Sequence, residues 1–359
     1  MAKLQKMLIM AGGTGGHVFP GLAVATQLRE QGVEVHWLGT QKGLEARLIP
    51  QADIPLHFIT ISGLRGKGLK DVFLMPFRLI KAITQAIFVI KKLRPNVILG
   101  LGGFVSGPGG IASWILRRPL VIHEQNAKAG MTNQWLAKVA TKVLEGFPNT
   151  FLPQMHAIAT GNPVRDAIAK MPPPQAHFQE RSGPLRLLVV GGSLGATVIN
   201  QFMPRALGKM SLGERPSVYH QTGEKHFQAT LEAYQSEGIK AQIVPFIEDM
   251  ASAYAWADLV LCRAGALTIA ELCAAGRGSI LIPYPHAVDD HQTANANYLI
   301  VNKAAIVVQQ KDLTEDVLIS ILKQQASVGH CLAMATAAYS LRKVDATTNV
   351  LMVCKEAAL

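Results

Sequence analysis

The sequence has few of the residues that build metal sites and disulfide frameworks. Its 359 residues include only four cysteines, none in a C-x-x-C pair and none at a zinc-ligand spacing from histidine. A disulfide scaffold and a structural zinc site are therefore excluded. We expect all four to be buried, reduced thiols: Cys262, Cys273, Cys331 and Cys354.

Several common ligand-binding patterns are also missing. The absence of G-x-x-x-x-G-K-[ST] excludes a P-loop. No D-x-D triplet occurs, so we expect no catalytic metal, and no pattern indicates another cofactor. The first residues, MAKLQKMLIMAGG, contain a short apolar run that passes straight into glycines, without the cleavage site of a signal peptide. We expect this run to be a first β-strand.

Charged residues are scarce, at 16%, but their signs are strongly unbalanced. The formal net charge of +11 and the pI of about 9.6 favour anionic partners: nucleotides, nucleic acid or an acidic membrane surface. The interval 60–95 holds eight basic residues against one acid, Asp71, and so carries seven of the eleven excess charges. No nucleic-acid-binding motif accompanies this charge, and we expect no nucleic-acid partner.

One stretch without charge, 95–116, is long enough to span a bilayer. It contains six glycines and two prolines. These residues favour a strand at 96–99, a glycine loop at 100–110 and then a helix over a transmembrane segment.

Short apolar strands alternate with helical patterns over two successive halves of the chain. This alternation predicts parallel sheets covered by helices on both faces. The first half includes a predicted helix at 20–31, with Pro20 in its first turn. The predicted strands are 7–10, 33–38, 97–99, 120–122, 143–146, 186–190, 217–221, 242–244, 259–262, 279–282 and 305–308.

A stretch rich in proline and polar residues separates the two halves. GNPVR (161–165) leads into KMPPPQAHFQERSGP (170–184), which we interpret as an interdomain linker and surface loop. A chain of 359 residues exceeds what one core normally holds, so two domains are expected. Ligands of doubly wound sheets bind at the carboxyl ends of the strands, which predicts a site in the cleft between the domains.

Three glycine loops follow predicted strands: GGTGGH (12–17), GLGGFVSGPGG (100–110) and GGSLGA (191–196). Glycine lets a ligand approach the backbone, and a helix N-terminus behind the loop offers free N–H groups to phosphate. One such loop is more often a plain strand–helix turn, but three of them favour phosphate or sugar binding. GPGGIA (107–112) also fits G-x-G-x-x-A, a dinucleotide pattern.

Seven segments, in order along the chain, together resemble the MurG family. Its members are the bacterial UDP-N-acetylglucosamine:lipid I N-acetylglucosaminyltransferases of peptidoglycan synthesis. The resemblance covers almost the whole chain, and its specificity lies in the combination of segments. They are GGTGGHVFPGLAVA (12–25), GGFVSGPGG (102–110), HEQNA (123–127), GNPVR (161–165), GGSLGA (191–196), RAGALTIAE (263–271) and DDHQTANA (289–296).

The resemblance implies an α/β chain with the GT-B glycosyltransferase fold, two doubly wound, Rossmann-like domains facing a cleft. It implies an acceptor-binding, membrane-facing domain at 1–163 and a domain at 164–339 that binds UDP-N-acetylglucosamine (UDP-GlcNAc). A final helix, about 340–359, would return to the N-terminal domain. The implied reaction is an inverting transfer of GlcNAc to the 4-hydroxyl of MurNAc in lipid I, giving lipid II.

The family's donor contacts carry over to matching residues. Glu271 would accept hydrogen bonds from both ribose hydroxyls, the backbone of Ile247 would recognise uracil, and Gln292 would hold GlcNAc hydroxyls. Ser193 and Arg165 would stabilise the departing diphosphate, since helix N-termini and guanidinium groups both favour phosphate. Without the resemblance, Glu271 would be a solvent-facing helix acid. The other implied contacts are Thr14, Gly15, Gly16, Asn126, Ala266, Leu267, Thr268, Ile269 and Ala270.

Two residues are candidates for the base that takes the acceptor proton. His17 ends the first glycine loop, and an unperturbed histidine has a suitable pKa. Glu124, in HEQN, follows a predicted strand and would face the cleft. His17 is slightly preferred because its glycine neighbours and strand-end position argue against a structural histidine, but the residues leave both open.

The segment Val72–Ile90 mixes apolar residues, such as Phe77 and Phe88, with Arg78 and Lys81. The residues alone are typical both of an amphipathic helix packed on a core and of a face that binds an anionic membrane. The resemblance favours the membrane, at the cytoplasmic face of the bacterial inner membrane, with Trp114 in the same patch.

Three other functions compete with sugar transfer. A UDP-GlcNAc 2-epimerase would bind the same donor but would need neither a lipid acceptor nor a membrane patch. An NAD-dependent oxidoreductase rests on GPGGIA alone, and a basic nucleic-acid-binding protein rests on the pI alone. The sequence indicates no particular protein partner.

Overall fold

The computed structural model describes residues 4–61, 74–179, 181–192 and 195–358. The chain divides into two compact units. Unit 1 comprises Met1–Arg165 and Asp345–Leu359, and unit 2 comprises Asp166–Val344. Unit 2 therefore begins two residues after the predicted start at 164, and the return to unit 1 comes five residues after the start predicted near 340.

Unit 1 is built on a seven-stranded parallel sheet in the order β3-β2-β1-β4-β5-β6-β7. Met7 of β1 pairs with Val35 of β2 and with Val97 of β4, so the strand order reverses between β1 and β4, as in a doubly wound sheet. The strands are β1 (Lys6–Met10), β2 (Glu34–Gly39), β3 (Leu56–Phe58), β4 (Val97–Gly100), β5 (Leu120–Glu124), β6 (Lys142–Glu145) and β7 (Ile158–Ala159).

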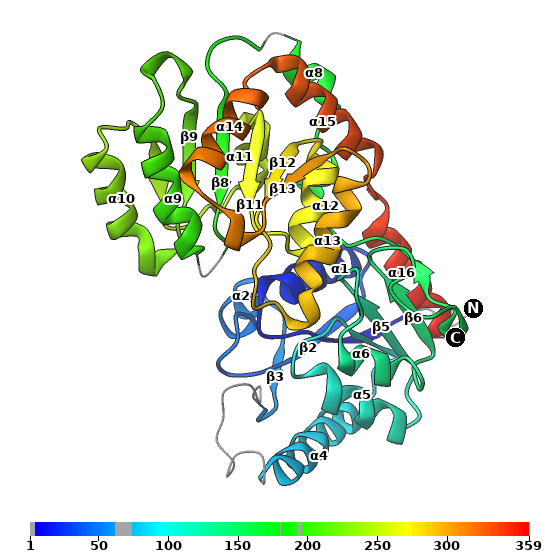
Figure 1. Ribbon diagram of the computed structural model, residues 1–359. Coiled ribbons are helices and arrows are strands. Elements are labelled where there is room, and N and C mark those ends of the chain that lie inside the picture. The colour runs from blue at the N-terminus through cyan, green and yellow to red at the C-terminus, as the bar shows by residue number, and fades with distance from the viewer. Residues whose placement is uncertain (1–3, 62–73, 180, 193–194, 359) are drawn as a thin grey trace. The chain divides into compact units, whose positions relative to one another are not determined.

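Helices cover both faces of this sheet (Figure 1). Successive β1 residues alternate between the two faces, so Ile9 joins the apolar cluster under α1 and α16, and Met10 the cluster under α4 and α5. The last helix, α16, packs on α1 and on strands β4 to β6. The helices are α1 (Gly15–Glu30), α2 (Glu45–Gln51), α4 (Met75–Leu93), α5 (Ser106–Ile115), α6 (Met131–Leu136), η1 (Pro153–Met155) and α16 (Ala346–Ala357).

Unit 2 has a six-stranded parallel sheet in the order β10-β9-β8-β11-β12-β13, with the reversal between β8 and β11. The strands are β8 (Arg186–Val190), β9 (Ser217–Gln221), β10 (Gln242–Val244), β11 (Leu259–Cys262), β12 (Gly278–Leu281) and β13 (Ala305–Val307). The α-helices are α7 (Asp166–Ala169), α8 (Pro174–Phe178), α9 (Thr197–Gly208), α10 (Phe227–Ser236), α11 (Met250–Trp256), α12 (Ala266–Ala275), α13 (His291–Ile300), α14 (Glu315–Gln325) and α15 (Val328–Ser340). Its 3-10 helices are η2 (Leu212–Glu214), η3 (Glu224–His226), η4 (Val288–Asp290) and η5 (Gln310–Asp312). The predicted α/β class with two doubly wound sheets is confirmed.

Two predicted helix starts are wrong. α1 begins at Gly15, so Pro20 lies inside the helix instead of in its first turn, and the carbonyl of Gly16 has no i+4 N–H donor there. α5 begins at Ser106, inside the predicted glycine loop 100–110. Gly109 is needed within that helix because a Cβ there would lie 2.2 Å from Met10 Sδ. The short strands β3 and β7 are not among the predicted ones.

The stretch 170–184 is more than the predicted linker and surface loop. It contains α8, whose Phe178 is buried in the core of unit 2. The carboxylate of Asp258 accepts hydrogen bonds from His177 Nε2 at 2.9 Å and from Arg181 Nε at 2.9 Å. Burial acts to raise the pKa of Asp258, but these hydrogen bonds together lower it. The segment is therefore anchored to the strand β11 that follows Asp258.

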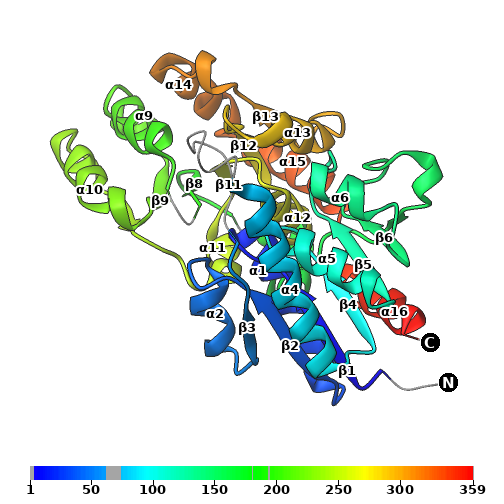
Figure 2. The same cartoon turned by 90° about the horizontal axis from the view of Figure 1, so that it is seen from below.

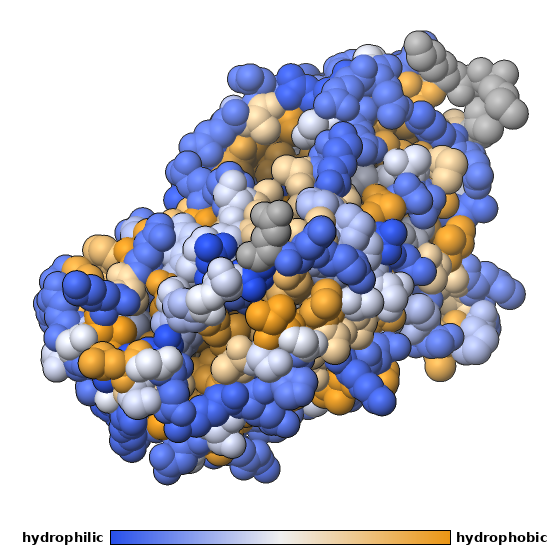
Figure 3. All heavy atoms as spheres, turned by 90° about the horizontal axis from the view of Figure 1, so that it is seen from above, coloured by the Kyte–Doolittle hydropathy of each residue, from blue (hydrophilic) through white to orange (hydrophobic). Residues whose placement is uncertain are grey.

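The face of the molecule drawn in Figure 3 mixes hydrophilic and hydrophobic side chains. On the face in Figure 3, hydrophilic side chains form most of the outline and hydrophobic ones lie in separate groups between them. No helix in the described ranges is both long and apolar enough to cross a bilayer. All four cysteines are buried and unpaired, as predicted, and burial raises the pKa of each thiol to about 12.

Candidate active site

The predicted site residues of unit 1 lie at one edge of its sheet. All its strands are parallel, so the segments that follow them meet at the carboxyl edge. Thr14 and His17 follow β1, Asn126 follows β5, and Arg165 follows β7. Gly15 and Gly16 form the start of α1, where N–H groups are free of helical partners.

The first two glycine loops pack directly on each other. Gly103, with φ +76°, approaches the first loop so closely that a Cβ there would lie 2.2 Å from the carbonyl oxygen of Gly12. A Cβ on Gly102 would lie 2.8 Å from Cδ2 of His17. The half-buried His17 ring is thus held against the second loop, with its Nδ1 3.4 Å from Thr14 Oγ1.

A buried carboxylate that was not predicted fixes the first loop. Glu45, at the start of α2, has no exposed surface. It accepts hydrogen bonds from Gly13 N at 2.9 Å, Thr40 N at 2.9 Å and Thr40 Oγ1 at 2.8 Å. An acid in the first turn of a short helix is commonplace, so the sequence carries no signal for this role.

Glu124 is also buried, and both of its oxygens are occupied. Oε1 accepts from the backbone N and from Nδ2 of Asn126, each at 3.0 Å. Oε2 accepts from Gly130 N at 3.1 Å and Asn133 Nδ2 at 2.8 Å. The carboxylate therefore shapes the loop that presents Asn126.

Two predicted motifs, HEQNA and GNPVR, are joined in unit 1. His123 Nε2 donates to the carbonyl of Gly161 at 2.9 Å, and Asn162 Nδ2 donates to the carbonyl of Gln125 at 3.0 Å. Burial lowers the pKa of His123, which favours its neutral form. These bonds bring the chain leading to Arg165 beside the loop of Asn126.

Arg165 lies near the first turn of α1. Its guanidinium carbon is 5.4 Å from the centre of the Phe19 ring. A Cβ on Gly15 would lie 2.9 Å from Cε2 of that same ring. Phe19 therefore links the glycine start of α1 to Arg165.

The third glycine loop follows β8 at the carboxyl edge of unit 2. Ser193 and Leu194 fall outside the described residues. The loop is held by the side-chain amide of Gln221, which accepts from Gly192 N at 3.1 Å and donates to Gly192 O at 3.0 Å and Pro245 O at 3.1 Å.

A buried network of uncharged, hydrogen-bonded side chains lies next to this loop. Asn200 Nδ2 donates to the carbonyl of Thr222 at 2.9 Å, and its Oδ1 is 3.0 Å from Nε2 of His220. The other ring nitrogen of His220 is 2.9 Å from the hydroxyl of Tyr234. Burial lowers the pKa of His220 to about 3, so the network carries no charge at neutral pH.

The segment RAGALTIAE directly follows β11 and includes the start of α12. Ala266, Leu267 and Ile269 have buried side chains, and Thr268 and Ala270 are partly exposed. Glu271 is only 6% exposed, so it is not a solvent-facing helix acid. Tyr254 Oη, on α11, donates to Glu271 Oε2 at 3.1 Å. Tyr254 was not predicted, because the contact joins two helices 17 positions apart.

The remaining donor candidates follow β10 and β12. Ile247 is buried beyond the end of β10. Gln292, in the first turn of α13, accepts at Oε1 from Tyr284 N at 2.9 Å, which directs its two N–H donors away from that contact. The preceding residues, Asp289 and Asp290, have left-handed φ angles of 52° and 54°, a strained backbone often found at functional sites.

Comparison with known proteins matches both halves of the chain to one family. The model of the glycosyltransferase family 28 N-terminal domain matches residues 7–145, and that of the family 28 C-terminal domain matches residues 186–350. A relative from Marinobacter nauticus is 55% identical over 355 residues, covering 99% of this chain and 98% of the relative. It is named UDP-N-acetylglucosamine--N-acetylmuramyl-(pentapeptide) pyrophosphoryl-undecaprenol N-acetylglucosamine transferase.

Solved structures of glycosyltransferases are also similar to this chain. MurG of Acinetobacter baumannii is similar with a TM-score of 0.83 at 40% identity, covering 98% of this chain and 99% of that one. The glycosyltransferase VinC, in complex with DTDP, is similar with a TM-score of 0.68 at 15% identity, covering 99% of each chain. The second likeness is one of fold alone, and both support the predicted GT-B fold.

Proposed function

The chain belongs to glycosyltransferase family 28, and from this premise we propose that it transfers GlcNAc from UDP-GlcNAc to the 4-hydroxyl of MurNAc in lipid I. The product is lipid II, for peptidoglycan synthesis. The observation that carries the proposal is the 55% identity, over nearly the full length of both chains, to a relative of that name. The chain is thus a hexosyltransferase, and the 2-epimerase alternative is not favoured.

The reaction requires a base for the acceptor hydroxyl, and we assign this role to His17. Its ring is held at the carboxyl edge of unit 1 by Gly102, in a half-buried setting. Glu124 suits the role less well, because each of its oxygens already accepts two hydrogen bonds. Its contacts fit a residue that positions Asn126. Unit 1 would accordingly bind the acceptor.

The donor would bind at the carboxyl edge of unit 2. Glu271 is buried yet follows a strand end, and Tyr254 fixes one of its oxygens, an arrangement suited to accepting two ribose hydroxyls. Gln292 would donate to GlcNAc oxygens, and the backbone of Ile247 would read uracil.

The leaving diphosphate needs positive potential, since negative charge builds on it in the transition state. The backbone N–H groups of the third loop and the start of α12 would supply part of it. Arg165 would add a guanidinium, and Ser193, which lies outside the described residues, would contribute its hydroxyl. Because these groups can take the place of a metal, we expect transfer to proceed without one.

Membrane attachment would occur through α4, at the cytoplasmic face of the bacterial inner membrane. The helix turns Ala82, Ala86 and Ile90 toward the core. Its large residues Phe77, Ile80 and Phe88 are 65%, 62% and 70% exposed. Exposed apolar side chains beside Arg78 and Lys81 suit an anionic bilayer surface. Val72 and Phe73, at the start of the predicted segment, lie outside the described residues.

The test is transfer of radiolabelled GlcNAc from UDP-GlcNAc to a lipid I analogue by the purified chain. We expect label in the lipid product and release of UDP. Conversion of UDP-GlcNAc to its 2-epimer without any acceptor, and no labelled lipid, would instead support the epimerase. Stabilisation by NAD but not by UDP-GlcNAc would support an oxidoreductase.

A further inference from the structure

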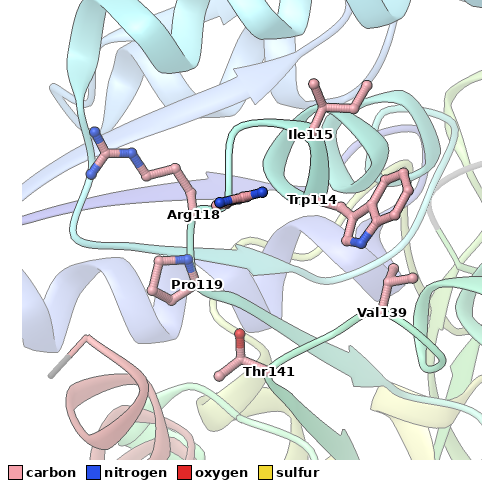
Figure 4. Close-up of a pocket in the computed structure, with 7 residues that line it drawn as sticks. Trp114, Ile115, Arg118, Pro119, Val139 and Thr141 are labelled. Carbon is pink, nitrogen blue, oxygen red and sulfur yellow. The ribbon is translucent and has the colours of Figure 1, made fainter.

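A surface pocket of about 550 Å³ lies at the end of α5, away from every residue assigned above to donor or acceptor. One part of its lining is apolar: Trp114, Ile115, Pro119 and Val139 (Figure 4). The rest is polar or cationic: Arg117, Arg118 and Thr141. A pocket of this kind suits a ligand that has an anionic group next to an apolar one.

The two guanidinium groups are available to such a ligand. Among the described residues, neither the Arg117 nor the Arg118 side chain has a hydrogen-bond or ion-pair partner. Thr141 Oγ1, in contrast, already accepts from Leu120 N at 3.1 Å. Paired arginines bind phosphate oxygens through their planar N–H forks, which makes a phosphate the best-matched anionic group.

The pocket is at the opposite edge of the sheet from the candidate active site. Pro119 and Thr141 directly precede β5 and β6, so they mark the amino edge. The glycine loops follow β1 and β4 at the carboxyl edge. A strand of five residues separates the two edges by on the order of 15 Å. This separation argues against the acceptor's own diphosphate as the ligand.

The exposed apolar residues of α4 extend along the helix toward the amino edge of the sheet of unit 1. Phe77, Ile80 and Phe88 share one helix face, because they stand at i, i+3 and i+11. α4 packs against α5, and the two lie side by side in Figures 1 and 2. α4 ends just before β4, so Phe88 lies toward the amino edge, where α5 also ends with Trp114. The pocket and the Phe88 end of α4 therefore lie at the same edge of the sheet.

We propose that this pocket binds the phosphate diester of an anionic glycerophospholipid. Arg117 and Arg118 hold the phosphate, and the lipid's glycerol and first methylene groups contact Trp114 and Val139. The inference rests on the proposed membrane attachment through α4 and goes beyond it. It gives the attachment a discrete headgroup site, which would fix how unit 1 lies on the bilayer.

The test compares binding to vesicles of phosphatidylcholine with binding to vesicles that also contain phosphatidylglycerol. Three double variants of the full chain are used: R117A/R118A, R117K/R118K and the control K42A/R47A. The control removes the same two charges from exposed positions of unit 1. A fourth variant, F77S/F88S, removes the apolar face of α4.

We expect R117A/R118A to weaken binding to phosphatidylglycerol vesicles about thirtyfold, since each cation at an anionic surface contributes roughly fivefold. Binding to pure phosphatidylcholine should not change. R117K/R118K should regain only part of the binding, because lysine keeps the charge but loses the fork. K42A/R47A should stay close to the unmodified chain.

A second readout locates the lipid directly. Phosphatidylglycerol with brominated acyl chains should quench tryptophan fluorescence in the unmodified chain and lose most of that quenching in Trp114→Phe. Unchanged quenching in that variant would contradict the assignment.

Two results would overturn the headgroup site: full recovery in R117K/R118K, or an equal loss in K42A/R47A. Either result would mean that vesicle binding depends on the net positive charge of unit 1 and not on a specific headgroup site. If F77S/F88S alone lost vesicle binding, the pocket would be wrong but α4 attachment would stand. If F77S/F88S bound both kinds of vesicle normally, the proposed attachment itself would fail.

Discussion

The carboxyl edges of the two sheets hold their loops with opposite kinds of side chain. In unit 1, buried carboxylates accept hydrogen bonds from the backbone N–H groups of the loops. Glu45 accepts the N–H of Gly13, and Glu124 accepts that of Gly130. Glu145, at the end of β6, accepts the N–H groups of residues 149–151.

In unit 2 the third glycine loop and the start of the loop after β9 are held by neutral groups, whereas the cation Arg263 donates to the carbonyls of Ile282 and Pro283 after β12. Gln221 holds Gly192 through both ends of its amide, and Asn200 holds the carbonyl of Thr222. The His220 next to Asn200 is kept neutral by burial, which lowers its pKa to about 3. Glu271 is a buried carboxylate at this edge, and its proposed partner is a ribose and not a loop.

The difference matches the charge of the proposed ligands. A fixed negative charge about 5 Å from a diphosphate costs about 3 kcal/mol at an effective dielectric constant of 20. A neutral amide holds the third loop without that cost. Unit 1 would activate a neutral hydroxyl at its edge, where buried carboxylates do no such harm.

The largest effect is expected from His17→Ala in unit 1. Loss of a general base typically lowers the rate about 10²–10⁴-fold. Affinity for UDP-GlcNAc should remain nearly intact, because a base acts on the acceptor hydroxyl and not on the donor. Single-turnover transfer at saturating donor, across pH, measures the rate, and the ascending limb of the profile should disappear.

Glu124→Gln is the matched comparison for that variant. It keeps the shape of the side chain, so we expect a smaller loss of rate. If Glu124→Gln were nearly inactive while His17→Ala kept most of its rate, Glu124 would be the base. A fall in donor affinity in His17→Ala would point to a role on the leaving group.

The next largest effect is expected from Gln221→Glu. This substitution places a carboxylate at the third glycine loop, as in the loops of unit 1. It removes the donation to Gly192 O and brings a charge toward the diphosphate. We expect donor affinity to fall by about 3 kcal/mol, on the order of a hundredfold. Calorimetry with UDP-GlcNAc measures this.

Gln221→Leu separates the two causes in that experiment. It removes the hydrogen bonds without adding charge, so its loss of affinity relative to the unmodified chain should not depend on salt. The Glu variant should regain part of its affinity at high ionic strength. Equal behaviour of the two variants would mean that charge at this edge is unimportant.

Glu271→Ala should weaken donor binding by about 1–3 kcal/mol, through the loss of hydrogen bonds to the ribose. The loss should be much smaller with a 2′-deoxyribose donor, since one bond is already missing. Unchanged affinity for UDP-GlcNAc in calorimetry would remove Glu271 from the site.

Tyr254→Phe should have a smaller effect of the same kind, about 0.5–1.5 kcal/mol. Its hydroxyl acts through Glu271 by fixing one carboxylate oxygen. KM for the donor should rise while kcat stays nearly constant. In the background of Glu271→Ala the same substitution should do nothing more, and an additive loss would contradict the linkage.

No effect is expected from chelation. If backbone N–H groups and Arg165 stabilise the negative charge on the departing diphosphate, EDTA should leave the transfer rate unchanged. Loss of transfer on chelation, followed by recovery with Mg²⁺, would show that a metal takes part.

Local patterns in the sequence predicted much of this architecture. Glycine loops after apolar runs marked the carboxyl edges, and the strands of unit 2 were predicted within a residue at each end. Pro20 was misplaced because the glycines before it can continue a helix, which a rule about proline in the first turn does not cover. The stretch 170–184 was misread because Asp258, which anchors it, lies far along the chain.

The site was predictable only where a family motif pointed to it. Glu45 and Tyr254 act through contacts between separate elements, and neither has a local signature. The two interpretations of α4 could not be separated from composition. Its buried face consists of Ala82, Ala86 and Ile90, whereas the large residues Phe77, Ile80 and Phe88 are exposed.

The division of labour between the units can be tested by comparing His17→Ala and Glu271→Ala in two assays. One assay is the single-turnover rate at saturating donor, and the other is the Kd of UDP-GlcNAc. We expect His17→Ala to lose rate but keep its Kd, and Glu271→Ala to lose affinity but recover its rate when donor is saturating. If both variants lost rate and affinity together, acceptor activation and donor binding would not be separable in this way.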